Sequence, residues 1–242
     1  MTTKNTPYPF PDEDVSPRLL ISAGPTHEPI DAVRFIGNRS SGKLGILLAE
    51  HAASLGWNIT LLLGPTCQSP ASESIRLERF VSTHDLQRLL ISHAPSCDVL
   101  VMAAAVADFT PEETDPTSKL RRSDSKNLTL TLSPTPDLLA GCCQTAGPTQ
   151  LMVGFALEPA NELIKSARHK LGRKNADLIV ANPLETMESG EIQASIVASP
   201  PLSAYERCTE GKVSKAEFAR WLLPILTAAW QSKRTTTETD PT

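Results

Sequence analysis

The chain has 242 residues, which suggests one large domain or one domain with a small appendage. Apolar residues make up 40% and charged residues 21%, proportions that are typical of a globular protein and not of a disordered one. The formal net charge of −4 argues against general nucleic-acid binding, which usually needs a basic surface. The longest uncharged apolar run, residues 99–107, is far shorter than the ~20 residues that a membrane-spanning helix needs.

The two ends of the chain differ in composition from its middle. Residues 1–17 are rich in proline, threonine and acidic side chains and contain no apolar core, which predicts a flexible leader and not a signal peptide. We therefore expect a cytoplasmic protein. Residues 233–242 form a polar stretch that predicts a disordered tail, so the folded domain is expected at 18–232.

The five cysteines predict neither a disulfide framework nor a zinc site, because their number is odd and no pair has C-x-x-C spacing. We expect them to be reduced, with the adjacent Cys142 and Cys143 packing inside a helix.

Apolar runs alternate with segments of helical periodicity along the chain. In chain order we expect a strand at 18–23, a helix at 41–57, strands at 58–63 and 77–81, a helix at 83–93, a strand at 98–103, a long mobile loop at 108–126, a strand at 127–132, a helix at 136–145 capped by Thr135, a strand at 151–155, a helix at 159–174, strands at 178–181 and 192–198, and a last helix to Trp230 opened by a Ser214–Glu217 capping box. This order predicts an α/β fold, a three-layer Rossmann-like sandwich with a mainly parallel central sheet, whose ligands bind beyond the carboxyl ends of the strands.

The segment 34–45 reads R-F-I-G-N-R-S-S-G-K-L-G and opens the first expected helix. A Ser/Gly-rich turn in this place presents backbone N–H groups to an anion, although it also suits a plain helix cap. Residues 37–43 satisfy the G-x-x-x-x-G-K part of a P-loop, but Leu44 stands where that motif needs Ser or Thr for magnesium. The dinucleotide pattern G-x-G-x-x-G is absent, so we interpret the segment as a phosphate-type loop of a third kind.

Three further segments carry possible chemistry. Small residues followed by Asp108 (A-A-A-V-A-D, 103–108) suit close approach of a ligand to a strand end, or simple packing with a turn aspartate. Lys119, Arg121 and Arg122 suit a cationic loop that closes over a polyphosphate, or a solvated charge run. Lys170 and Lys174 lie four residues apart and so share one helix face.

Taken together and in this order, the segments resemble the phosphopantothenate–cysteine ligase family, in its bacterial CTP-using form. The resemblance covers residues 18–230 and rests on S-A-G-P-T-H-E-P-I-D (22–31), V-R-F-I-G-N-R-S-S-G-K-L-G (33–45), A-A-V-A-D (104–108), K-L-R-R (119–122), P-T-P-D (134–137), V-G-F-A-L-E (153–158) and I-V-A-N (179–182). It implies that 4′-phosphopantothenate attacks CTP to give an acyl-cytidylate and pyrophosphate. The amine of L-cysteine then displaces CMP, a step of coenzyme A synthesis in which magnesium accompanies the triphosphate.

The resemblance also implies roles for particular residues. It makes Asn38, which contacts the acyl group, and Lys119, which stabilises the phosphates, the catalytic residues. The implied nucleotide-binding residues are Gly24, Ser40, Gly42, Gly45, Met102, Ala103, Ala104, Asp108, Lys119, Pro136, Asp137, Leu138, Leu139, Phe155, Lys170, Lys174 and Asn182. The implied phosphopantothenate-binding residues are Arg34, Asn38, Ala104, Ala105 and Asp108.

Arg34 is expected to reach the site of a neighbouring subunit, which implies a homodimer. Many family members carry an N-terminal flavin-dependent decarboxylase, which we expect here on a separate chain.

The chain departs from the family pattern at Pro25, at His27, at Pro159 and at Arg121 and Arg122, which replace two lysines. Two other interpretations remain at this point: an NAD(P) or flavin oxidoreductase, which would need the missing G-x-G-x-x-G loop, and a regulator that binds nucleotide without turnover.

Overall fold

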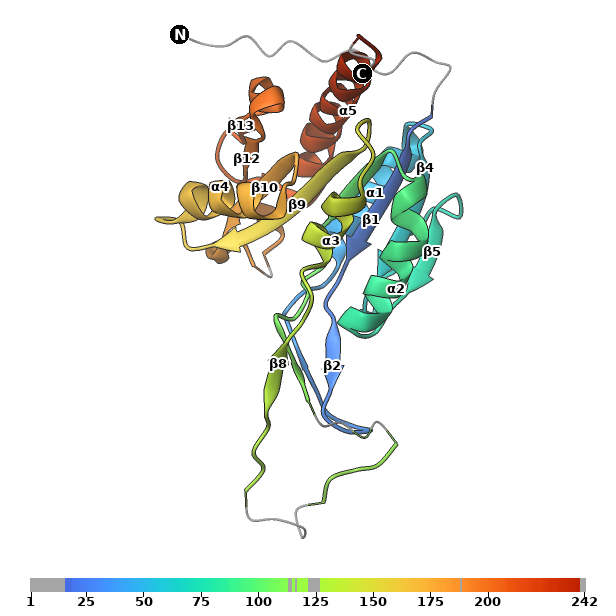
Figure 1. The fold of residues 1–242 in the computed structure, drawn as a ribbon, viewed down its shortest axis with the longest axis vertical. Helices are drawn as coiled ribbons and strands as arrows, with labels where there is room; N and C mark the ends of the chain where they lie inside the picture. Colours follow the sequence, from blue (N-terminus) through green and yellow to red (C-terminus); the bar gives the residue numbers. More distant parts are fainter. Residues whose placement is uncertain (1–15, 113–114, 116, 122–126, 188, 240–242) are drawn as a thin grey trace.

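The computed structural model describes residues 16–112, 115, 117–121, 127–187 and 189–239. Its main sheet has eight strands in the order β13–β12–β10–β9–β6–β1–β4–β5 (Figure 1). Their bounds are Arg18–Ala23 (β1), Asn58–Leu63 (β4), Arg76–Arg79 (β5), Val99–Met102 (β6), Leu151–Glu158 (β9), Leu178–Pro183 (β10), Ser195–Ala198 (β12) and Arg207–Cys208 (β13). The strands from β5 to β10 run parallel, and β12 and β13 continue the sheet antiparallel.

Helices cover both faces of this sheet. One face is packed by α1 (Lys43–Ser54) and α5 (Lys215–Thr239), and the other by α2 (Thr83–His93), α3 (Leu138–Thr145) and α4 (Leu163–Lys174). Strand β1 shows why: Leu19 and Ile21 belong to the core under α1 and α5, whereas Leu20 belongs to the core on the opposite face. Continuous apolar strands buried on both faces produce the predicted three-layer sandwich with a mainly parallel sheet.

A long arm projects from the body beyond the carboxyl ends of the strands (Figure 1). We define the arm as the described residues within 27–37 and 109–134. It contains two antiparallel pairs: β2 (His27–Pro29) with β3 (Phe35–Gly37), and β7 (Phe109–Pro111) with β8 (Leu132–Pro134). A third small pair, β11 (Glu191–Ile192) with β14 (Val213–Ser214), and the short 3-10 helices at Ala94–Ser96, Leu184–Thr186 and Pro200–Tyr205 complete the elements of the described residues.

Asp31 joins the two halves of the arm. Its buried carboxylate accepts hydrogen bonds from the backbone N–H groups of Val33, Arg34 and Leu120, at 2.8, 2.8 and 3.1 Å, and from the Arg34 guanidinium. Arg34 in turn donates to the Leu120 carbonyl at 2.7 Å. The hydrogen bond of Arg34, assisted by these N–H donors, holds the pKa of Asp31 well below its usual range.

Several sequence-based expectations need correction. Residues 127–131 do not form the expected half-exposed strand; β8 begins at Leu132 and pairs within the arm, so the alternating leucines face no neighbouring strand of the main sheet. Part of the expected 108–126 loop is strand β7, and Glu113, Thr114, Pro116 and residues 122–126 lie outside the described residues. Helix α3 is capped by Asp137, which accepts from the Ala140 N–H at 3.1 Å, because the Thr135 hydroxyl donates instead to the Ala107 carbonyl at 2.6 Å.

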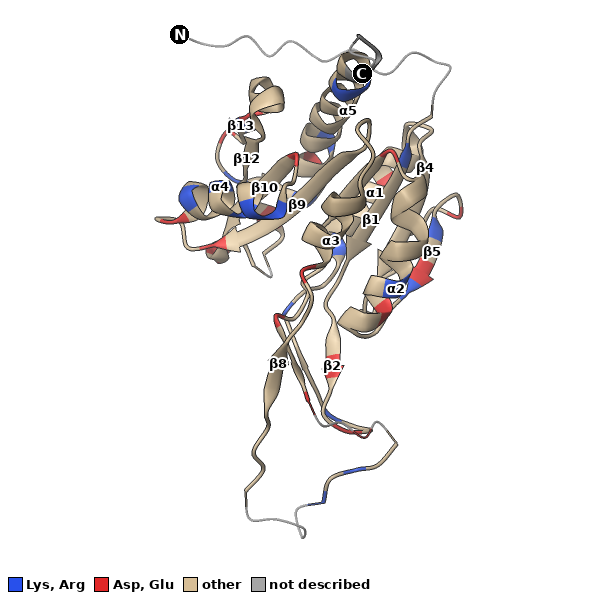
Figure 2. Cartoon of the chain, viewed as in Figure 1, with Lys and Arg blue, Asp and Glu red and all other residues tan. Residues whose placement is uncertain are grey.

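The last helix starts with the predicted Ser214–Glu217 capping box but continues to Thr239, through part of the expected tail. Lys233 forms an ion pair with Asp177 at 2.7 Å, which holds this extra segment to the body. Within the helix, the Arg234 guanidinium lies over the Trp230 ring. The expected leader at 1–17 falls almost wholly outside the described residues. Among the described helices, none combines the length and the apolar character needed to cross a bilayer. Acidic and basic residues are interspersed over the body (Figure 2).

Candidate active site

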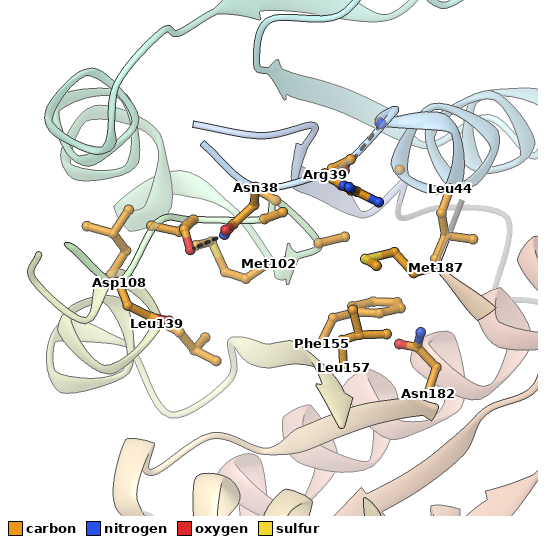
Figure 3. A pocket seen from close by; sticks show the side chains of 18 of the residues that line it. Asn38, Arg39, Leu44, Met102, Asp108, Leu139, Phe155, Leu157, Asn182 and Met187 are labelled. Carbon is orange, nitrogen blue, oxygen red and sulfur yellow. Dashed lines mark hydrogen bonds between the residues drawn. The ribbon is translucent and has the colours of Figure 1, made fainter. Parts of the chain in front are cut away.

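A cavity of about 1050 Å³ opens at the carboxyl ends of the parallel strands. Its walls come from the segments 37–45, 102–106 and 134–139, with side chains from β9, α4, β10 and the start of α5 (Figure 3). This is the place where ligands bind in open α/β sheets. The predicted residues that line it are Asn38, Ser40, Gly42, Gly45, Met102, Ala103, Ala104, Ala105, Asp108, Pro136, Asp137, Leu138, Leu139, Phe155, Lys170, Lys174 and Asn182.

The Ser/Gly-rich segment forms the tight entry to α1. Gly42 caps the helix in the left-handed region, with φ 71°, and a Cβ there would lie 3.0 Å from the Leu63 side chain. A Cβ on Gly45 would lie 2.4 Å from the Cβ of Ala23, so this glycine allows α1 to approach β1 closely. Helix α1 has neither an acidic side chain in its first turn nor a side-chain cap, which leaves its positive end to the cavity.

Asn38 lies opposite the strand-end segment 103–108. Its Nδ2 donates to the Val106 carbonyl at 2.9 Å (Figure 3). An amide NH₂ group carries two N–H donors, so this bond orients the side chain and leaves a second donor for a ligand. Asp108 is exposed at the mouth of the cavity, as the strand-end pattern predicts.

The two predicted lysines of α4 are already paired. Lys174 Nζ lies 2.6 Å from a carboxylate oxygen of Asp137, and Lys170 Nζ lies 2.5 Å from one of Glu158. Burial works against the charged form of Asp137, but Lys174 and the Ala140 N–H prevail and lower its pKa. An anion that binds to these lysines therefore competes with carboxylates of the protein, which the sequence pattern did not indicate.

Three predicted site residues do not line the cavity. Gly24 lies behind the Ser/Gly-rich segment. If Gly42 carried a Cβ atom, that atom would lie 3.4 Å from the backbone N of Gly24. Arg34 and Lys119 lie on the arm, where Arg34 is paired with Asp31 and Lys119 is exposed. Residue 122, the last of the K-L-R-R segment, lies outside the described residues.

The cavity also contains residues that the sequence analysis did not select. Lys43 had a signal, because it completes the G-x-x-x-x-G-K pattern. Arg173 also had one, because it adjoins Lys174 in the basic segment. Thr186, Met187 and Lys215 had none, since only the tertiary fold brings their segments to the cavity.

Comparisons with known proteins place the chain in a family. The family model described as "DNA/pantothenate metabolism flavoprotein C-terminal domain" matches residues 15–228. A relative from an unknown prokaryotic organism, named "Cysteine/Cysteine sulfinic acid decarboxylase", is 40% identical over 214 residues, which are 86% of this chain and 58% of the relative. The "Coenzyme A biosynthesis bifunctional protein CoaBC" of Mycobacterium bovis is 39% identical over 186 residues, which are 74% of this chain and 44% of that protein.

The same fold occurs in a solved structure. The crystal structure of the C-terminal domain of a CoaBC protein superposes with a TM-score of 0.72 and 31% identity, covering 89% of this chain and 96% of that one. The chain thus spans about half the length of the curated relatives that it matches and nearly all of an isolated domain. The extent of the family match, together with the shared fold, shows that the chain belongs to the family of the DNA/pantothenate metabolism flavoprotein C-terminal domain.

Proposed function

We propose that this chain ligates 4′-phosphopantothenate to L-cysteine through an acyl-cytidylate, releasing pyrophosphate and CMP, in coenzyme A biosynthesis. The observation that carries the proposal is the meeting of three distant segments, 37–45, 102–106 and 134–139, around one cavity. A relative that is 39% identical is named a coenzyme A biosynthesis protein, which supports the assignment to that pathway.

The chemistry suits such a cavity. Attack of a carboxylate on a triphosphate brings two anions together, so cations and oriented N–H donors must offset their repulsion. The start of α1 and the lysines that line the cavity supply positive potential. In the second step, the remaining N–H of Asn38 would donate to the acyl carbonyl oxygen while the cysteine amine attacks the acyl carbon and CMP leaves.

Magnesium belongs to the proposal as a partner of the triphosphate. Among the residues that the structure describes, no group of three or more His, Cys, Asp or Glu side chains forms a metal site. Magnesium in nucleotide sites typically keeps few protein ligands and binds substrate phosphates instead. Asp108 at the mouth of the cavity and the substrate phosphates would hold the ion, which supplies neutralisation of phosphate charge.

Two assigned site residues, the catalytic Lys119 and the phosphopantothenate-binding Arg34, require movement or a partner. Lys119 lies on the arm and outside the cavity, so it reaches a triphosphate only if its segment moves or if it serves the site of a second subunit. Arg34 has the same placement, which supports the proposal that it serves a neighbouring subunit of a homodimer. A flavin-dependent decarboxylase is a proposed partner, since the ligation product carries the cysteine carboxylate that such an enzyme removes. The cytoplasm is the proposed location.

One relative's name raises a second reaction, because it refers to decarboxylation of cysteine or its sulfinic acid. The cavity favours ligation, since it is lined by the phosphate-type loop at the start of α1, which a decarboxylation of free cysteine does not use.

The test is an assay of pyrophosphate release from purified protein with 4′-phosphopantothenate, L-cysteine and magnesium, with CTP and ATP compared. Release that depends on phosphopantothenate and is faster with CTP supports the proposal, and a preference for ATP would change the nucleotide only. Binding of CTP without release would indicate the binding-only regulator. Release of CO₂ from cysteine without nucleotide would favour the decarboxylase.

A further inference from the structure

Two lysines to which the proposed function gives no individual role line the cavity. Lys43 is the first residue of α1, and Lys215 is the first residue of α5. Both side chains line the cavity, although they are far apart in sequence, because α1 and α5 pack side by side on the same face of the sheet.

Neither lysine has a carboxylate partner among the described residues, in contrast to Lys170 and Lys174. The acidic residue in the first turn of α5, Glu217, is held in the capping box by the Ser214 N–H at 2.9 Å. The positive charges of the two lysines are therefore not neutralised within the described structure.

Three physical terms make this arrangement unfavourable without a ligand. The Lys215 side chain is partly buried, which penalises its charged form, and Lys43 repels it; together these lower the pKa of Lys215. In addition, each lysine lies at the positive end of its own helix. The negative charge of a bound phosphate group would offset the repulsion between the two lysines and would interact favourably with both helix ends. Its attraction to Lys215 would also compensate the burial of that lysine.

We propose that Lys43 and Lys215 form a phosphate-binding subsite of the cavity. The subsite takes a phosphate group with two or more negative charges. Its source, which rests on the proposed function, is either the polyphosphate of the nucleotide or the 4′-phosphate of phosphopantothenate.

The experiment measures binding of inorganic phosphate and pyrophosphate to the full chain by calorimetry, for wild type and for Lys215→Met, Lys215→Arg and Lys212→Met. Loss of one charge-assisted hydrogen bond weakens binding by about tenfold, so we expect that loss in Lys215→Met for at least one of the anions. Lys215→Arg should retain binding. Lys212 is exposed and outside the cavity, so Lys212→Met should bind as wild type.

Thermal unfolding without phosphate separates a binding role from a structural one. Because Lys215→Met removes like-charge repulsion and a cation at a helix N-terminus, we expect its melting temperature to be equal to that of wild type or higher. Unchanged binding of both anions in Lys215→Met would overturn the subsite. This holds whether the variant is as stable as wild type or unfolds at a lower temperature.

Steady-state kinetics then identify the source of the phosphate. A KM raised for CTP alone assigns the nucleotide, and a KM raised for phosphopantothenate alone assigns the 4′-phosphate. If wild type releases no pyrophosphate yet binds the anions in a Lys215-dependent way, the ligase proposal fails and the subsite stands.

Discussion

At the scale of single residues, the site depends on side chains that are oriented before a ligand arrives. Asn38 is the clearest case, since its bond to Val106 fixes the amide against the strand-end segment. Cys142 and Cys143, in contrast, are packing residues and not ligand-binding ones. Burial raises the pKa of Cys142 to about 11 and that of Cys143 to about 12, which keeps both as thiols that pack inside α3 as predicted.

Replacing Asn38 tests its role directly. In Asn38→Asp the side chain loses its donors and places a negative charge beside the Val106 carbonyl. We expect single-turnover pyrophosphate release to persist in part, while amide formation falls by about 10²-fold, the usual cost of losing one transition-state donor. Asn58→Asp is the control, because Asn58 is exposed at the start of β4 and outside the cavity. Equal loss of both steps in Asn38→Asp would contradict an acyl-contact role.

At the scale of elements, the position of α1 on the sheet depends on a glycine. In Gly45→Ala the new Cβ overlaps the Cβ of Ala23, which is attached directly to β1 and has no rotamer through which to escape. We expect the free energy of unfolding to fall by about 1–3 kcal/mol, as for overpacked cores, in urea denaturation. Gly141→Ala in α3 is the matched control, because a Cβ there meets nothing within 4 Å and should stabilise the helix by about 0.5–1 kcal/mol. An unchanged midpoint in Gly45→Ala would mean that α1 shifts freely.

The Asp31 carboxylate is one of the groups that join the two halves of the arm, and this predicts a pH dependence. The folded-state pKa of Asp31 is depressed, so its contribution is present in full above the unfolded pKa of ~4 and is lost as pH falls through the lower folded value. We expect the Leu120 N–H to be protected from hydrogen exchange at pH 7 and to lose protection in acid. Asp31→Asn should lose that protection at pH 7, whereas Glu73→Gln, at an exposed carboxylate, should not. Equal protection in both variants would show that Asp31 does not clamp the arm.

At the scale of the whole molecule, the arm presents apolar side chains that the body does not cover. The exposed apolar residues on it are Val33, Phe35, Phe109, Leu120, Leu128 and Leu132. Exposed apolar side chains on a projecting element are typical of a protein interface, and a second copy of the chain is the occupant that the homodimer proposal gives this surface.

This surface yields a prediction about oligomeric state. We expect wild type to be a dimer by light scattering and Phe35→Glu and Leu128→Glu to shift toward monomer, because each places a charge in an apolar contact. Two variants are used because Phe35 also stacks on His27. Ile91→Glu is the control, since Ile91 is 69% exposed on α2 and away from the arm. A dimer that survives both arm substitutions would assign the interface to another surface.

Most of the sheet could be predicted from sequence because its strands are continuous apolar runs. The expected strands at 18–23 and 58–63 and the helix at 83–93 agree with β1, β4 and α2 to the residue. The segment 127–132 misled the prediction, because alternation shows which side chains share a face but not whether a neighbouring strand or solvent covers that face. The end of α5 was missed because its ion pair with Asp177 joins residues distant in sequence.

By itself, the sequence determined the fold class and the Ser/Gly-rich loop, since these depend on local patterns. Most of the cavity-lining residues followed from the resemblance of its segments to a known family. Only the tertiary structure decided which cations are already paired, that Lys119 and Arg34 lie on an arm outside the cavity, and that Lys215 joins Lys43 within it. The reason is that burial, charge pairing and the approach of distant segments are properties of three-dimensional packing. No spacing of residues along the chain specifies them.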